Sequence, residues 1–172
     1  LRITQLGTAA GIVGVGLSFG RAEITGRTRS VVESGASVTG DQIVVRSDNE
    51  ADADIQVFHA GGGAVNVVGA SIEADIDTGA VTHIEDGARL EATGREPAEH
   101  SALLVEAVSD GDGTADIPPA FAVGLLSFGA GVANADIENE ARVIIGAAEQ
   151  ASGVDGAELI AEQGSITIDA SV

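Results

Sequence analysis

The sequence of 172 residues contains no cysteine, methionine, tryptophan, tyrosine or lysine. Without cysteine the chain has neither a disulfide framework nor thiol chemistry. Without lysine it lacks phosphate-loop and Schiff-base chemistry, because both need a lysine amine. Only four residues are aromatic, so valine, alanine, isoleucine and 24 glycines must fill any core.

Basic residues are also scarce: the chain has eight arginines and 27 acidic residues, which gives a net charge of −19. This balance argues against nucleic acid as a partner, since nucleic-acid binding needs a basic surface. A strongly acidic surface keeps chains soluble and suits a saline or calcium-rich exterior. The start at Leu1 and the lack of methionine indicate a processed product or an excised segment. The glycine-rich apolar stretches at 3–20 and 118–135 do not exceed the roughly 18 residues of a membrane span, so no membrane insertion is predicted.

Three similar blocks recur along the chain, as in repeat architectures. Each begins with an A-x-I triplet, and a G-A-x-[VL] element follows it, after eight extra residues in the third block. The triplets are Ala22-Glu23-Ile24, Ala74-Asp75-Ile76 and Ala135-Asp136-Ile137. The following elements are Gly35-Ala36-Ser37-Val38, Gly87-Ala88-Arg89-Leu90 and Gly156-Ala157-Glu158-Leu159.

A five-residue apolar element ends each block, at Ile43–Ser47, Leu103–Ala107 and Ile166–Ala170. Leu1–Gln5 resembles the end of a preceding copy. The steps from Ile3 to Val45, Val105 and Ile168 are then 42, 60 and 63 residues. The sequence therefore predicts one repetitive segment, 1–172, with three irregular repeats at about 1–47, 48–107 and 108–172.

The apolar period within the blocks is two, which is typical of a strand with one wet face. Alanine and isoleucine are predicted to point inward. The acidic residues predicted to point outward are Glu23, Asp75, Asp77, Asp136 and Glu138. Short strands separated by glycine, asparagine and aspartate predict an all-β fold, with a short helix around 138–150 as the strongest exception. Because one repeat is too short to bury its own face, stacked coils of a β-solenoid are favoured over a sandwich.

Upstream of each acidic alternation, both faces of the predicted strand are apolar, and such a strand is normally covered on both sides. A second sheet, another segment or a neighbouring chain must cover the outer face, which is otherwise an association site. The residues predicted to mediate this packing and assembly are Val15, Leu17, Phe19, Val65, Val67, Leu126, Phe128 and Val132.

These elements resemble the repeats of large bacterial filamentous adhesins and autotransporter passengers, of the filamentous-haemagglutinin-like and leukotoxin-like kinds. The matching elements are Val13-Gly14-Val15-Gly16, Ala22-Glu23-Ile24, Gly35-Ala36-Ser37-Val38 and Ile43–Ser47. The resemblance spans nearly the whole chain. It implies secretion, a right-handed parallel β-helix, and a role as a stalk or fibre. The strong acidity and the third-block insertion depart from the family pattern and question the regularity of the coils.

Motifs of catalysis are sparse. Gly16–Gly20 matches the G-x-S-x-G nucleophile elbow, but Leu-Ser-Phe-Gly recurs at 126–129, which favours packing. The histidines His59, His83 and His100 lack metal-ligand spacing and are predicted at surfaces or in loops. No enzyme activity is predicted.

Calcium is the one ligand that the sequence suggests. Asp110, Asp112 and Asp116 place three carboxylates on what reads as a glycine-rich loop, and Ca²⁺ prefers such oxygens. A solvated acidic loop is the plainer interpretation. The run 48–54 is a weaker second candidate.

Three functions follow in order of preference. The first is a structural component of an extracellular or cell-surface filament or adhesin stalk, whose partners are copies of itself or adjacent repeats. The second is a ligand- or glycan-binding adhesin module, in which 94–101 or 109–119 form receptor-binding loops. The third is a polysaccharide-cleaving β-helix enzyme, which the lack of aromatic platforms disfavours.

Overall fold

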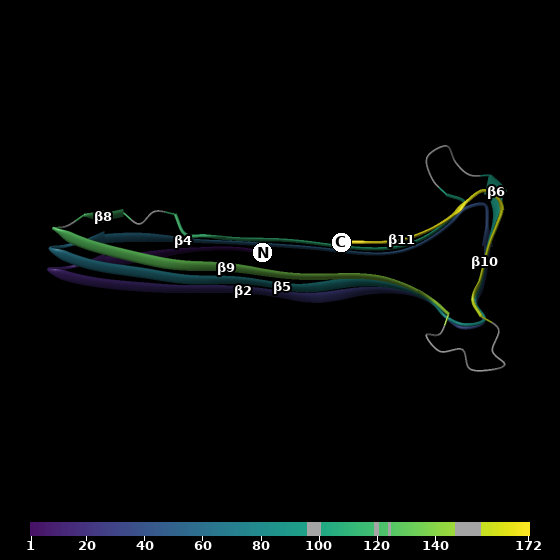
Figure 1. The fold of residues 1–172 in the computed structure, drawn as a ribbon, viewed down its shortest axis with the longest axis horizontal. Coiled ribbons are helices and arrows are strands. Elements are labelled where there is room, and N and C mark those ends of the chain that lie inside the picture. The colour runs from purple at the N-terminus through teal and green to yellow at the C-terminus, as the bar shows by residue number, and fades with distance from the viewer. Residues whose placement is uncertain (96–100, 119–120, 124, 147–155) are drawn as a thin grey trace. The chain divides into compact units, whose positions relative to one another are not determined.

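Every secondary-structure element in the described residues is a β-strand (Figure 1). The computed structural model describes residues 1–95, 101–118, 121–123, 125–146 and 156–172. The strands are β1 Arg2–Ala10, β2 Val13–Val32, β3 Ser37–Gly40, β4 Ile43–Gly62, β5 Val65–Ile84, β6 Arg89–Arg95, β7 Leu103–Asp116, β8 Phe121–Val123, β9 Leu126–Ile145, β10 Glu158–Gln163 and β11 Ile166–Ser171. The predicted all-β class is confirmed. The short helix considered around 138–150 as an exception is not formed over residues 138–145, which lie in β9, and residues 147–150 lie outside the described ones.

The strands form three sheets. Their orders are β1-β4-β7-β11, with β8 also paired to β4, then β2-β5-β9, and β3-β6-β10. The pairs of defined register are all parallel. The chain therefore visits the three sheets in the same order three times, as β2-β3-β4, β5-β6-β7 and β9-β10-β11 (Figure 1). Each of these passages is called a round below.

Most of the aligned repeat elements lie side by side on neighbouring strands. Ile168 of β11 lies opposite Val105 of β7, as the 63-residue step predicts. Arg89 of β6 pairs with both Ser37 of β3 and Glu158 of β10. These registers confirm the alignment of the G-A-x-[VL] elements and of the last two five-residue elements.

The predicted alignment of Ile3 with Val45 is wrong. Ile3 of β1 lies opposite Ile55 of β4, a step of 52 residues. Arg2 accordingly forms an ion pair with Asp54, with 3.3 Å between Nε and Oδ2. Steps of 42 and 52 are both even, so both registers keep the same side chains on the inner face, and alternation alone does not distinguish them.

Four strands are long, whereas the sequence predicted short strands. β2, β4, β5 and β9 each run for 20 residues, whereas strands are usually 3–10 residues long. Their glycines and acidic residues indicated turns, but none of the four contains proline, and glycine in a strand weakens pairing without ending it. The predicted repeat boundaries after residues 47 and 107 fall inside β4 and β7.

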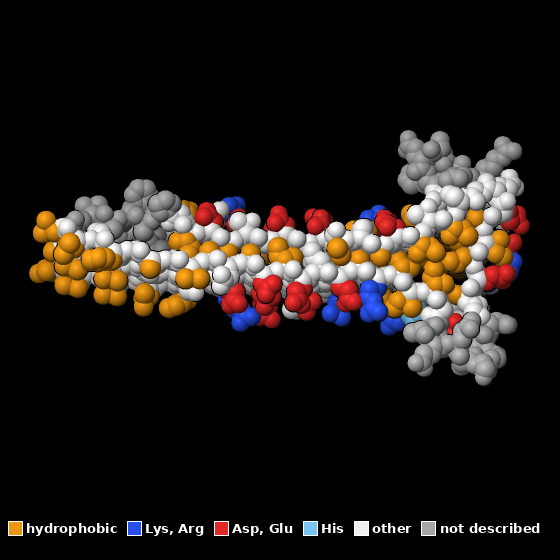
Figure 2. Space-filling model, viewed as in Figure 1, with side chains coloured by type: hydrophobic (Ala, Val, Ile, Leu, Met, Phe, Trp, Pro, Cys, Tyr) orange, Lys and Arg blue, Asp and Glu red, His pale blue; other side chains and the backbone are white. Residues whose placement is uncertain are grey.

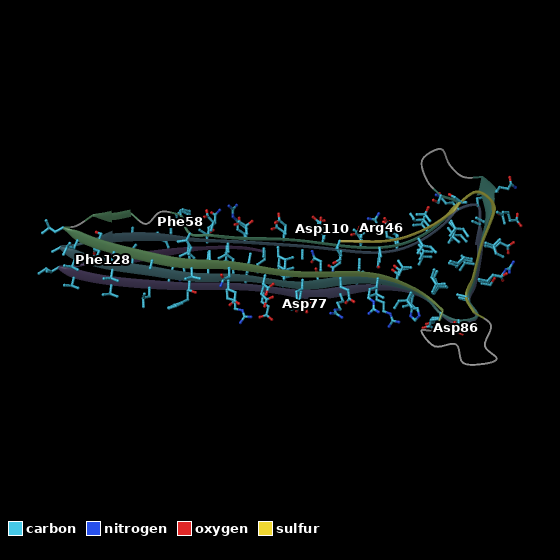
Figure 3. The ribbon with its side chains drawn as sticks, in the orientation of Figure 1. Arg46, Phe58, Asp77, Asp86, Asp110 and Phe128 are labelled. Carbon is cyan, nitrogen blue, oxygen red and sulfur yellow. The ribbon has the colours of Figure 1, made fainter. Side chains whose placement is uncertain are left out.

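The chain divides into two compact units. Unit 1 comprises 1–25, 51–77 and 111–138, and unit 2 comprises 26–50, 78–110 and 139–172. In unit 1 the buried side chains come from alternate positions of the strands and are small or β-branched. The buried cluster is Ala22, Ala51, Ala53, Ile55, Val57, Ala70, Ile72, Ala74 and Ile76. The prediction that alanine and isoleucine point inward is confirmed on β5, where Asp75 and Asp77 lie on the outer face. Figure 3 shows Asp77 on this face.

Glycines in the interior of unit 1 make room for isoleucines from the facing sheet. A Cβ at Gly20 on β2 would lie 3.5 Å from Ile55 Cγ2 on β4, and one at Gly113 on β7 would lie 3.3 Å from Ile76 Cδ1 on β5. A different glycine separates β4 from β5: Gly63 has a φ of +154°, and a Cβ there would lie 1.9 Å from the carbonyl oxygen of Gly11. The high glycine content therefore lets backbones and branched side chains approach closely.

Unit 2 has an apolar cluster and a polar interior. The cluster is Ile43, Ile84, Ala88, Leu90, Ala92, Ala102, Leu103 and Val105. Elsewhere in this unit, Nδ2 of Asn49 donates to the carbonyl oxygens of Gly26 at 2.9 Å and Gly79 at 3.0 Å. The hydroxyl of Thr78 donates to Oδ1 of Asn139 at 2.9 Å. Inner positions that lack apolar side chains thus carry hydrogen bonds instead, as buried polar groups require.

The turns before β3 and β6 are equivalent. Gly35 and Gly87 have φ values of +72° and +73°, which favour glycine. Beyond the second turn, Arg89 forms ion pairs with Glu158 on β10 and, at 3.1 Å, with Glu91 on its own strand. Hydrogen bonds to these carboxylates, that to Glu158 above all, raise the pKa of Arg89 above its ordinary value.

Candidate assembly surface

The sequence-predicted assembly residues gather on one outer face of unit 1. The alternation of β2 and β5 buries one row of side chains and exposes the other, and Figure 2 shows apolar side chains collected where β2, β5 and β9 begin. Leu17, Phe19 and Phe128 are 65%, 70% and 61% exposed. The apolar patch, as it is called below, consists of Val13, Val15, Leu17, Phe19, Val65, Val67, Leu126, Phe128 and Val132.

A shallow groove of about 170 Å³ lies within the patch. Its lining is apolar except for one hydroxyl and consists of Leu17, Phe19, Gly69, Ala70, Ser71, Ala130, Gly131 and Val132. Gly69 creates the groove, because a Cβ there would lie 3.0 Å from Cδ2 of Leu17. Gly69 was not predicted from the sequence, although it marks a position where an outer side chain is absent.

The patch lies in a region free of formal charge. No aspartate, glutamate, lysine or arginine occurs in residues 3–20, 55–72 or 117–135. Further along the same face of unit 1, Arg21 forms ion pairs with Asp75 at 3.3 Å and with Glu23 at 3.5 Å. The outer face of unit 1 therefore changes from apolar to charged along its strands, as the sequence predicts.

A second exposed apolar pair lies on the other long sheet of unit 1. Leu6 of β1 is opposite Phe58 of β4, and their exposures are 69% and 39%. Phe58 points outward from β4 (Figure 3). This pair was not predicted from the sequence, because the surrounding residues carry no repeated element.

Asp110, Asp112 and Asp116 lie on β7 rather than on a loop, so the predicted loop is wrong. The intervening glycines face the interior, where Gly113 accommodates Ile76 and Ile137. The three aspartates occupy alternate positions and are exposed, and Figure 3 shows Asp110 pointing outward. Among the described residues, no three His, Asp or Glu side chains are grouped so as to hold a metal. Calcium binding by these aspartates stays a prediction.

The G-x-S-x-G match lies entirely within β2, with the Ser18 side chain 4% exposed on the inner face. The strand-to-helix turn of a nucleophile elbow is therefore not formed at these residues. His83 contacts Arg29, with 3.1 Å between Nδ1 and Nη2. His59 lies on β4, and His100 lies outside the described residues.

The structure describes different parts of the two segments that were predicted to be receptor-binding loops. Residues 109–116 belong to β7, so that part of the second loop is wrong. In the first loop, Gly94 and Arg95 end β6, and residues 96–100 lie outside the described part. No helix in the described residues is both long and apolar enough to cross a membrane.

Comparisons of the chain with protein-family models, with curated proteins and with solved structures find no match.

Proposed function

We propose that the chain is a structural, non-enzymatic segment of an extracellular or cell-surface filament or adhesin stalk, and that its rounds are coils of a right-handed parallel β-helix, or β-solenoid. The observation that carries the proposal is the repeated visit to three parallel sheets in one order. The second round pairs with both the first and the third, so that each round contacts its neighbours in the chain, as in quasi-one-dimensional repeat proteins. Right-handed connections are the rule between parallel strands.

The sheet edges support growth by stacking. Within the described residues, β2 and β9 are the edges of their sheet, and unpaired strand edges are templates for further strands. The burial of equivalent side chains also supports growth at this edge. Ile76 on the central strand β5 is fully buried, whereas Ile137 on β9 is 40% exposed. Copies of the chain, or adjacent repeats of one polypeptide, would bury Ile137 by pairing with β9.

A surface location fits the composition and the sequence resemblance. The charge of −19 keeps separate chains soluble until edges meet. Apolar contacts between layers or chains would come from the apolar patch. Rigid backbone ladders would then give the stalk its stiffness, and acidic outer faces its solubility.

A proline on β9 tests the stacking. Leu126 donates its amide to Ala64 and Gly146 donates to Ile84, so even-numbered amides of β9 point toward β5 and odd-numbered ones point away. Ala133→Pro removes an outward donor and blocks the edge, so filaments seen by electron microscopy should be lost while thermal unfolding stays cooperative.

Two variants complete that experiment. Ala133→Val keeps the amide, so it should assemble like the wild type. Asn134→Pro removes a donor that points toward β5, so it should lower the unfolding temperature. Filaments of Ala133→Pro equal in length to those of the wild type would overturn growth at the β9 edge. A wild-type chain that stays a discrete particle and binds a soluble ligand saturably would favour an adhesin binding module instead.

A further inference from the structure

We infer that the apolar patch pairs face to face with the same patch of a second copy, and that this pairing is stable only between chains already stacked end to end. The inference rests on the proposed filament function and adds its lateral partner. It follows from four features of the patch: its sheet surface, its groove, its lack of charge and its area.

The surface suits another sheet. The patch covers three neighbouring parallel strands with aliphatic and phenylalanine side chains. Two such faces pack at about 10 Å with their side chains interdigitated. A pair of identical patches related by a two-fold axis is the commonest arrangement in homo-oligomers.

The groove is too small for a separate ligand. Its volume of about 170 Å³ compares with the roughly 300–1,000 Å³ of small-molecule pockets. A groove of this size, opened by Gly69 between Leu17 and Ala130, suits single side chains of an opposing surface. Phe19 and Phe128 are exposed aromatic side chains of the patch that an identical copy would bring to this groove.

Charge disfavours the alternative occupants. A basic partner would find no acidic side chain in residues 3–20, 55–72 or 117–135. An anionic membrane surface would repel a chain with a net charge of −19. A second copy places two uncharged patches in contact and leaves the charged residues, from Arg21 onward, outside the contact.

The area makes pairing conditional on stacking. Residues 13–19 span about 20 Å of strand and three strands about 14 Å of sheet, so two patches bury on the order of 600 Å². Stable interfaces bury roughly 1,200–2,000 Å². Single chains therefore fall short, but two stacked chains against two others reach about 1,200 Å². Lateral pairing thus follows axial growth.

The test compares filament width in wild type and in a doubly substituted variant, Phe19→Asp with Phe128→Asp. Both side chains are exposed, so the fold should survive, as cooperative thermal unfolding would verify. Wild-type filaments should have twice the mass per length of variant filaments, with the same axial strand spacing. Phe58→Asp, on the other sheet of unit 1, is the matched control and should keep the double width.

The outcomes separate the two proposals. Wild-type filaments of single width, or a variant of unchanged width, overturn lateral pairing and leave axial stacking intact. If the wild-type chain forms no filaments under any condition, both the filament function and the lateral pairing are overturned. The edge-blocked Ala133→Pro chain should sediment as a monomer despite its intact patch, and a dimer would overturn the dependence on stacking. Flotation of wild type, but not of the double variant, with phosphatidylcholine vesicles would assign the patch to lipid instead.

Discussion

The hydroxyl groups of Ser47 on β4 and Thr82 on β5 lie 2.8 Å apart in the interior of unit 2, and both residues are almost fully buried. Thr82 Oγ1 also donates to the carbonyl oxygen of Glu106 at 2.6 Å. The contact between Ser47 and Thr82 joins β4 and β5, which belong to two different sheets. The interior of unit 2 is therefore specified by directional bonds as well as by apolar burial.

Replacing Thr82 with valine should lower the free energy of unfolding by about 1–3 kcal/mol, because Ser47 loses this buried hydrogen-bond partner. Chemical denaturation measures the change. The double variant Ser47→Ala, Thr82→Val should lose less than the sum of the two single losses, since neither hydroxyl is then stranded. Strictly additive losses would contradict the coupling.

Ile76→Asp should unfold unit 1 or lower its stability by more than about 4 kcal/mol, because it buries an unpaired carboxylate at a fully enclosed position. Ile24→Asp should cost less, since Ile24 is only partly buried. Thermal unfolding followed by circular dichroism gives the comparison. The control is Thr25→Asp on the exposed face. A fully stable Ile76→Asp chain would refute the assignment of Ile76 to the inner face.

Gly113→Val should destabilise unit 1 by about 1–3 kcal/mol through overpacking. Its new Cβ would already lie 3.3 Å from Ile76 and Ile137 before the branched methyls are added. Gly62→Val is the matched control, because nothing lies within 4 Å of a Cβ at that position. Urea midpoints of the two variants should differ in this direction, and equal midpoints would contradict the fit between glycine and isoleucine.

Raising the salt concentration from 0.1 to 1 M should increase the assembled fraction. Chains with a charge of −19 repel one another, and the screening length falls from about 10 Å to about 3 Å over this range. Light scattering follows the change. The edge-blocked Ala133→Pro chain should not respond, and an equal response there would indicate non-specific aggregation.

The sequence predicted the registers that depend on a repeated element and missed those that do not. Val105 and Ile168 were aligned correctly because each lies in a distinctive apolar run. Ile3 was placed ten residues from its partner because any even shift preserves an alternating pattern. Only the long-range pairing of β1 with the second half of β4 resolves that ambiguity.

The chemistry of glycine and aspartate explains the misplaced loop. Both are depleted in strands, so 110–116 read as a turn. In the structure, Gly111 and Gly113 face the interior of unit 1. The absence of a side chain at Gly113 leaves room for Ile76 from the facing sheet. That requirement for room is tertiary and has no local signature. The apolar patch, in contrast, was predictable because two-sided apolar strands are visible in sequence.

Electron microscopy of the native material, with a power spectrum of any filaments, tests the central claim most directly. Stacked rounds predict filaments with a layer line at about 4.8 Å along the axis, which is the spacing of hydrogen-bonded strands. Discrete particles without such a line would contradict assembly by strand stacking.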